Sequence, residues 1–114
     1  MKLNETMSLN EYQDAIKKFA IYPGAGTGNL SALSYTALGL TEEAGEYAGK
    51  VSKLIRDNVF ETQLAAKELG DVLWQLTRAA SELNLTLNDV AQMNIDKLTK
   101  RLKDGTISGS GDNR

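Results

Sequence analysis

Apolar residues at helical spacing constrain the fold of this chain more than any other feature. Between residues 31 and 57, and again between about 62 and 83, leucine, valine, alanine and aromatic residues recur every three or four positions. This period places them on one face of an α-helix. The chain contains no competing pattern of alternating apolar and polar residues, and its one proline, Pro23, precedes both stretches. We therefore predict an all-α fold with two long amphipathic helices.

Two shorter segments complete the predicted fold. Ser8 and Glu11 have the spacing of a capping box, which begins a first helix that ends before Pro23. Thr86 to Asp89 resembles another N-terminal cap, and its helix continues to about Lys103. Short connections favour antiparallel neighbours. The sequence thus predicts an antiparallel bundle of about four main helices in one domain: an N-terminal helix with a flexible glycine-rich loop (1–30), a helical core (31–103) and a flexible Gly/Ser tail (104–114).

The composition excludes several classes of function. A net charge of −2 over 114 residues gives no support for binding to nucleic acid or to an anionic membrane. The chain has no cysteine and no histidine, which excludes disulfides, zinc fingers, Ser-His-Asp triads and the Glu-x-x-His ligands of di-iron bundles. No segment resembles a signal peptide or a membrane span. We expect a cytoplasmic protein whose chemistry relies on carboxylates, amides and cations.

Two spaced pairs of carboxylates are the main candidates for a functional site. Glu43-x-x-Glu46 and Glu68-x-x-Asp71 each place two side chains on one helical face. On a helical wheel the first pair lies roughly 70° and 130° from its apolar stripe, and the second roughly 100° and 160° in the same sense. In an antiparallel helix pair these offsets fall on the same side, with the pair centres only ~5 Å apart in height. Glu42 lies nearly opposite the stripe and ranks below Glu43 as a ligand.

A converging set of carboxylates without histidine or cysteine favours a hard cation. Such oxygen sites select Mg²⁺, with Mn²⁺ as a possible substitute, over zinc or copper. Magnesium in turn commonly accompanies a phosphate-bearing substrate. The alternative is a solvent-facing set of salt bridges, such as one between Glu46 and Lys50, with no bound ion.

The last helix carries polar residues on its apolar face. Asn94 falls near the middle of the stripe, where a buried amide would need hydrogen-bond partners. Lys97 and Arg101 extend the same ridge and are suited to phosphate oxygens, a metal-bound water or a base edge. The alternative is a satisfied core asparagine beside two cations whose stems cover apolar surface. Gln75, one turn beyond Asp71, either hydrogen-bonds a ligand or faces water.

Three segments together resemble the MazG-like nucleotide pyrophosphohydrolases, which belong to the all-α NTP pyrophosphatases. They are residues 38–50 (LGLTEEAGEYAGK), 67–75 (KELGDVLWQ) and 94–98 (NIDKL). The ending GSGDNR resembles the tail of small single-domain members, and the similarity covers most of the chain from Tyr12 onward. The resemblance implies a MazG-like fold, a catalytic role for the core at 31–103, and Mg²⁺-dependent hydrolysis of nucleoside triphosphates to a monophosphate and pyrophosphate.

The resemblance also assigns roles to individual residues. Glu43, Glu46, Glu68 and Asp71 would hold the metal, and an activated water would attack the α-phosphorus. Either Glu42 or Glu43 would orient that water. The expected phosphate-binding residues are Lys50, Lys53, Lys97 and Arg101. Asn94 would contact the nucleotide or a metal-bound water, and Arg114 would close over the site with the tail.

The resemblance further implies a homodimer or homotetramer whose site draws on more than one subunit. The first functional hypothesis is a house-cleaning enzyme that removes non-standard or surplus nucleotides. A second is an enzyme of the dUTPase or dCTPase type with a dedicated base pocket. Outside the enzymes, the remaining alternative is a helical oligomerisation or interaction module whose carboxylates form salt bridges or a structural metal site.

Overall fold

The computed structural model describes residues 6–114, which form four α-helices, one short 3₁₀-helix and no strand. The all-α prediction is confirmed, and the three longer helices begin and end within a residue of the expected positions. The first helix is shorter than its apolar pattern suggests, because it tightens into the 3₁₀ turn after Ile16. The elements are α1 (Leu9–Ile16), η1 (Lys17–Phe19), α2 (Leu30–Asp57), α3 (Thr62–Glu82) and α4 (Leu87–Asp104).

Both predicted N-terminal caps are present, and each is a capping box. At the start of α1 the Ser8 hydroxyl accepts a hydrogen bond from the Glu11 amide at 3.1 Å, and the Glu11 carboxylate accepts from the Ser8 amide at 3.0 Å. Thr86 and Asp89 repeat this exchange at the start of α4, at 3.0 and 3.2 Å. Each box satisfies amide groups that the first turn of a helix leaves without intrahelical acceptors. Local sequence alone therefore fixes where these two helices begin.

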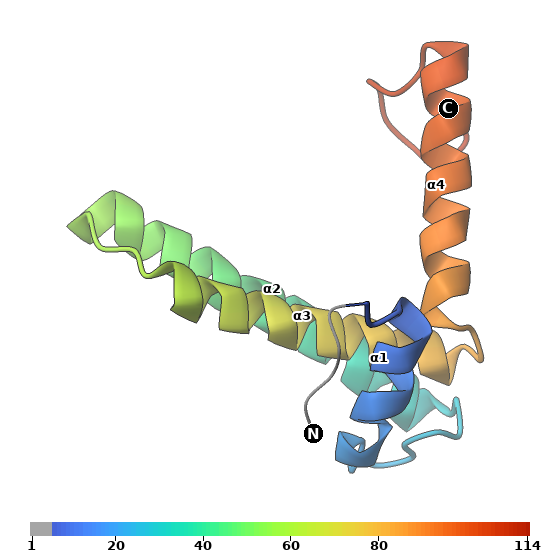
Figure 1. Ribbon diagram of the computed structural model, residues 1–114, viewed down its shortest axis with the longest axis horizontal. Coiled ribbons are helices and arrows are strands. Elements are labelled where there is room, and N and C mark those ends of the chain that lie inside the picture. The colour runs from blue at the N-terminus through green and yellow to red at the C-terminus, as the bar shows by residue number, and fades with distance from the viewer. Residues whose placement is uncertain (1–5) are drawn as a thin grey trace.

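Helices α2 and α3 form a long antiparallel hairpin that makes most of the contacts between helices (Figure 1). At its base, α1 and the loop before α2 pack against the end of α3. Tyr22 from this loop region stacks on Tyr35 of α2, with ring centroids 4.6 Å apart, and meets Trp74 of α3 edge-on at 6.3 Å. Ile16 and Ala80 are also buried here. The core is thus small and lies mostly at one end of the hairpin.

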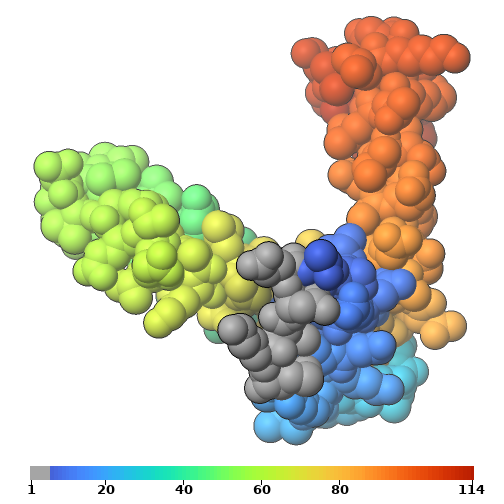
Figure 2. Space-filling model, in the orientation of Figure 1, coloured from blue at the N-terminus to red at the C-terminus, as the bar shows by residue number. Residues whose placement is uncertain are grey.

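Helix α4 points away from the α2–α3 hairpin, so the molecule has two arms (Figures 1 and 2). It contacts α1 and the end of α3 but does not pack along the hairpin. The radius of gyration is 16.6 Å, compared with about 13 Å for a compact domain of similar length. The sequence predicted a bundle, and this placement of α4 is where the observed arrangement differs from it.

The apolar face of α4 is covered at Leu87, which is 4% exposed, but is open farther along the helix. Its large side chains there are 42–69% exposed: Met93, Ile95, Leu98 and Leu102. Asn94, expected near a core, is also exposed, and that expectation is wrong for this chain taken alone. Helical periodicity identifies the face that is apolar but not the surface that covers it. No helix of the described residues is long and apolar enough to cross a membrane.

The glycine-rich loop is held by Glu82, a buried carboxylate at the end of α3. Glu82 accepts hydrogen bonds from the Tyr22 hydroxyl and from the amides of Gly26 and Gly28, at 2.8 and 2.9 Å to the two amides. Arg78 lies 3.5 Å away on the same helix. A side chain on Gly28, which has φ +67°, would also approach the Glu82 carbonyl at 2.8 Å. The loop is therefore tied to α3 rather than being the flexible linker that its composition suggested.

These contacts also set the ionisation of Glu82. Burial alone would raise its pKa, but the hydrogen bonds from Tyr22, Gly26 and Gly28, together with the Arg78 charge, outweigh burial and lower it. A lowered pKa in the folded state means that ionisation of Glu82 favours folding. This stabilisation is present above the unfolded value near 4.5 and is lost as the pH falls through the folded value.

Glu82→Gln should therefore destabilise the fold at neutral pH by about 3 kcal/mol, because it leaves the Arg78 charge buried without its partner. The free energy of unfolding in urea would be measured at pH 7 and at several values below 4.5. We expect the gap between wild type and variant to shrink in acid. Glu61→Gln is the control, since Glu61 makes no side-chain cap hydrogen bond at the start of α3. A gap independent of pH, or an equal loss in the control, would contradict this role for Glu82.

Candidate metal centre

Three carboxylates converge between α2 and α3. Glu43 of α2 and Glu68 and Asp71 of α3 each contribute an oxygen atom, and these three atoms lie within 4.8 Å of one another. Glu43 and Glu68 are partly buried, whereas Asp71 is exposed. The antiparallel packing of the hairpin places them on one side and at one height, as the helical wheel predicted. Three of the four paired carboxylates of the sequence are thus brought together by α2 and α3 alone.

The electrostatics of this cluster favour a bound cation. The pKa of Glu43 is raised, first by burial and then by the negative charge of Asp71, with smaller contributions from Glu42, Glu68 and Glu46. No cation among the described residues forms a close salt bridge with Glu43. The donors are all carboxylate oxygens, which match Mg²⁺ or Mn²⁺ and not zinc or copper. The residues therefore fit a hard divalent ion, which would relieve their mutual repulsion.

Glu46 and Glu42 lie outside the group of three. Glu46 is exposed, one turn along α2 from Glu43, although its charge still contributes to the raised pKa of Glu43. Its assignment as a fourth ligand stays a prediction. Glu42 is exposed as well, which agrees with its place on the wheel. Glu43 is more buried than Glu42 and belongs to the cluster. These two properties favour Glu43 over Glu42 as the residue that orients a water.

One of the predicted phosphate-binding lysines, Lys50, lies next to the cluster, and Lys53 shares a cavity with it. Lys50 Nζ is 4.0 Å from Glu68 Oε1, and it therefore bridges α2 and α3 rather than pairing with Glu46 along its own helix. Lys50 and Lys53 line a cavity of about 250 Å³ between the end of α2 and the start of α3, together with Phe60. A negatively charged ligand at the carboxylates could reach these cations within one chain.

The other predicted substrate-binding residues lie on the second arm. Asn94, Lys97 and Arg101 belong to α4, which diverges from the hairpin that carries the carboxylates (Figures 1 and 2). Arg114 also stays at that arm, because its guanidinium donates hydrogen bonds to the carbonyls of Thr106, Ile107 and Gly111 at 3.0, 3.3 and 2.6 Å. The tail folds back against α4 and does not cover the carboxylates of its own chain.

Gln75 and Gly39 form a contact one turn from the cluster that the sequence did not reveal. A Cβ atom on Gly39 of α2 would lie 2.3 Å from the Gln75 amide nitrogen, so the Gln75 side chain would have to move if a larger residue stood here. Gln75 is 6% exposed, which excludes the expectation that it faces water. Its Oε1 is buried without a hydrogen-bond partner within residues 6–114. The spacing in the sequence could have indicated this contact. Gly39 lies four residues before Glu43, and Gln75 lies four residues after Asp71, so the two face each other in an antiparallel pair.

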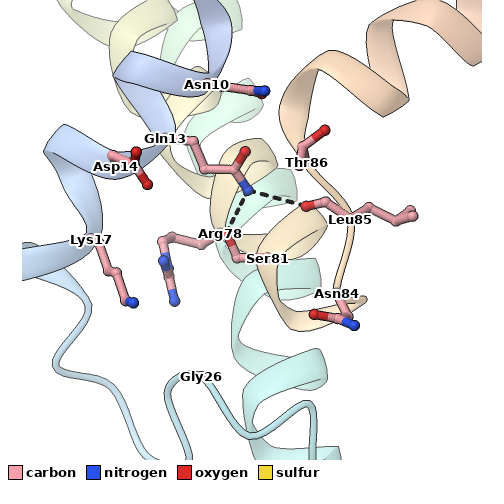
Figure 3. A pocket seen from close by; sticks show the side chains of 10 residues that line it. All are labelled: Asn10, Gln13, Asp14, Lys17, Gly26, Arg78, Ser81, Asn84, Leu85 and Thr86. Atoms are coloured by element: carbon pink, nitrogen blue, oxygen red, sulfur yellow. Dashed lines mark hydrogen bonds between the residues drawn. The ribbon is translucent and has the colours of Figure 1, made fainter.

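Helix α1 also approaches the carboxylates. Burial and the nearby charge of Asp71 raise the pKa of Tyr12. The opposite face of α1 lines a separate cavity of about 430 Å³ with the end of α3 and the glycine-rich loop (Figure 3). There the Gln13 amide donates to Ser81 Oγ at 2.9 Å and to the Leu85 carbonyl at 3.1 Å. None of the clustered carboxylates lines this cavity, so it does not belong to the metal centre.

The sequence of this chain is similar to those of known proteins, over a region that includes the carboxylate cluster. The sequence model of the MazG nucleotide pyrophosphohydrolase domain matches residues 31–106, which include the carboxylate cluster and all of α4. The chain is also 44% identical over 115 residues to the Gene 37 protein of Mycobacterium phage L5, a match that covers 95% of this chain and all of that protein. No solved structure matches. With the clustered carboxylates on two antiparallel helices inside the matched region, the chain belongs to the MazG nucleotide pyrophosphohydrolase family.

Proposed function

We propose that this protein hydrolyses nucleoside triphosphates, ribo- or deoxyribo-, to the monophosphate and pyrophosphate. The observation that carries the proposal is the convergence of Glu43, Glu68 and Asp71 in a chain of this family. An all-oxygen site of this kind suits the magnesium that accompanies phosphate transfer. Removal of non-standard or surplus nucleotides is the cellular role that we assign to this activity.

The carboxylates would hold Mg²⁺, or Mn²⁺ in its place, with Glu46 completing the set. When bound, the ion would lower the pKa of the attacking water and neutralise charge on the phosphates. Glu43 is the preferred group to accept a proton from the attacking water, because it is partly buried and lies within the cluster. Glu42 is the alternative. The water oxygen bonds to the α-phosphorus while the bond to the bridging oxygen breaks and pyrophosphate leaves.

Lys50 and Lys53 would bind the leaving phosphates. Lys50 already lies 4.0 Å from a cluster carboxylate, and both lysines line the adjacent cavity. Their positive charge would offset the charge that builds up on the leaving pyrophosphate. Lys97, Arg101 and Arg114 would supply further phosphate contacts, and Asn94 would contact the nucleotide.

We further propose that the complete site needs a second copy of the chain, in a homodimer or homotetramer. Within one chain α4 diverges from the carboxylates, so its cations do not reach them. The apolar faces of both arms are open: Leu38 and Ile55 of α2 are 71% and 82% exposed, and Leu102 of α4 is 69% exposed. Exposed apolar surface of this extent commonly marks a protein interface. Packing α4 of one copy over the hairpin of another would cover these faces and join the two sets of residues.

Magnesium should stabilise the fold through the cluster. At ten times its dissociation constant the ion should raise the melting temperature by several degrees, about 5 °C. Asp71→Asn should abolish most of that increase, whereas Glu42→Gln should keep it, because Glu42 lies outside the group of three. Thermal unfolding would be followed with Mg²⁺ and with EDTA at one protein concentration. An equal magnesium response in wild type and Asp71→Asn would contradict the proposed ligand set.

The activity itself is tested with a panel of nucleoside triphosphates, with and without Mg²⁺, while pyrophosphate release is followed. We expect metal-dependent release from at least one nucleotide. Glu46→Gln and Asp71→Asn should abolish turnover with nearly unchanged helical content by circular dichroism, and Glu42→Gln should have a milder effect. If no nucleotide is hydrolysed, the protein is instead the helical interaction module that its open apolar faces would equally allow.

Mixing two variants, each impaired in a different half of the proposed site, tests whether the site is shared between copies. Asp71→Asn removes a carboxylate of the hairpin, and Lys97→Gln removes a cation of α4. If each site combines the hairpin of one copy with α4 of another, an equal mixture that has exchanged subunits should recover about a quarter of wild-type activity. Each variant incubated alone is the control. A mixture no more active than its two components would contradict a shared site.

A further inference from the structure

The end of α4 holds a carboxylate from the C-terminal tail. Asp112 Oδ1 lies 3.1 Å from Lys97 Nζ and 3.2 Å from Arg101 Nη2. The same Arg101 nitrogen also donates to the Gly111 carbonyl at 3.2 Å. Figure 1 shows the tail returning alongside this end of the helix. The Asp112 carboxylate is therefore held by two cations, Lys97 and Arg101. Neither cation has an ion pair with another carboxylate of the described residues.

Arg101 has a hydrogen-bond donor that Asp112 does not use, and it could therefore bind an anion with more oxygens. Its side chain is only 8% exposed, and its Nε is buried without a hydrogen-bond partner in the described part of the chain. A buried donor that lacks an acceptor is costly, so an additional acceptor here would be favourable. Arg101 faces a cavity of about 210 Å³ that contains four cationic side chains and one carboxylate: Lys97, Lys100, Arg101, Arg114 and Asp112. The net charge of this cavity is positive and suits a polyanion.

Asp112 itself is weakly held. Its side chain is 81% exposed, and ion pairs with an exposed partner change an equilibrium by a few-fold at most. The neighbouring Lys97, and then Arg101, lower the pKa of Asp112, so it is ionised at neutral pH and competes as an anion. A ligand with several negative oxygens makes more charged hydrogen bonds than one carboxylate and can replace it.

We infer that the end of α4 is a polyphosphate-binding site that Asp112 occupies as an internal competitor until the ligand displaces it. The inference rests on the proposed function for the identity of the ligand, which is the triphosphate of the substrate or the released pyrophosphate. Displacement would also free the tail. Arg114, whose hydrogen bonds run to carbonyls of residues 106–111, would move with the tail and become available to the phosphates.

The test measures binding of inorganic triphosphate by calorimetry in EDTA, so that neither metal nor turnover is needed. Asp112→Asn should tighten binding about two- to fivefold, since it removes the competing charge. Asp96→Asn is the matched control, because it also removes one negative charge. Asp96 lies on α4 and hydrogen-bonds Gln92 rather than a cation. If Asp112→Asn binds triphosphate no more tightly than Asp96→Asn does, the competitor role is overturned.

Two further arms define the site and its ligand. Lys97→Gln should weaken triphosphate binding about tenfold, because it removes a charged hydrogen bond at a half-exposed position where folding is not at risk. In NMR spectra of the wild type, triphosphate should shift the amide signal of Gly111. Tighter binding of triphosphate than of pyrophosphate identifies the substrate as the ligand, and the reverse identifies the product. Binding of neither overturns the site.

These outcomes separate the inference from the proposed function. Hydrolysis of nucleotides without any effect of Asp112→Asn on anion binding removes the inference alone. Anion binding that responds to Asp112→Asn, in a protein that hydrolyses no nucleotide, removes the proposed activity alone and leaves a polyphosphate-binding module.

Discussion

The antiparallel packing of α2 on α3 is the contact on which the rest of the structure depends. Its register places Glu43 opposite Glu68 and Asp71, and one turn away it places Gly39 against Gln75. The same register carries Lys50 across to Glu68. A shift of one residue would turn the carboxylates away from each other, because successive helical positions differ by 100°. At the observed register the buried Gln75 side chain packs against Gly39, one turn from the metal centre.

Glu82 is buried and Glu43 is partly buried, and the two carboxylates have opposite surroundings. Glu82 receives hydrogen bonds from Tyr22, Gly26 and Gly28, and these lower its pKa. Glu43 has like charges as its close neighbours, and together with burial these raise its pKa. The first carboxylate is satisfied by the protein and fixes a loop. The second lies among like charges with no close cation in the described part of the chain, as expected of a carboxylate that binds a metal ion.

Much of this arrangement could be predicted from the sequence, and the failures have a common cause. Capping boxes and helical periods are local, so the ends of α2, α3 and α4 agreed within a residue, and the wheel placed Glu43 on the same side of the helix pair as Asp71. The position of α4 could not be derived, because an apolar stripe such as that of Leu98 and Leu102 is equally consistent with a partner in the same chain or in another. The order of the glycine-rich loop was also missed, since it depends on Glu82, more than fifty residues further along the chain.

The central claim is that Glu43, Glu68 and Asp71 bind a hard divalent ion between α2 and α3. The most direct measurement is anomalous diffraction from crystals grown with Mn²⁺, which reports the position of the ion without reference to activity. The account predicts an anomalous peak between the two helices, with oxygens of these carboxylates at roughly 2.1 Å, near the distance typical of a small hard cation. Ordered helices with no peak at this position, or a peak bound by other residues, would contradict it.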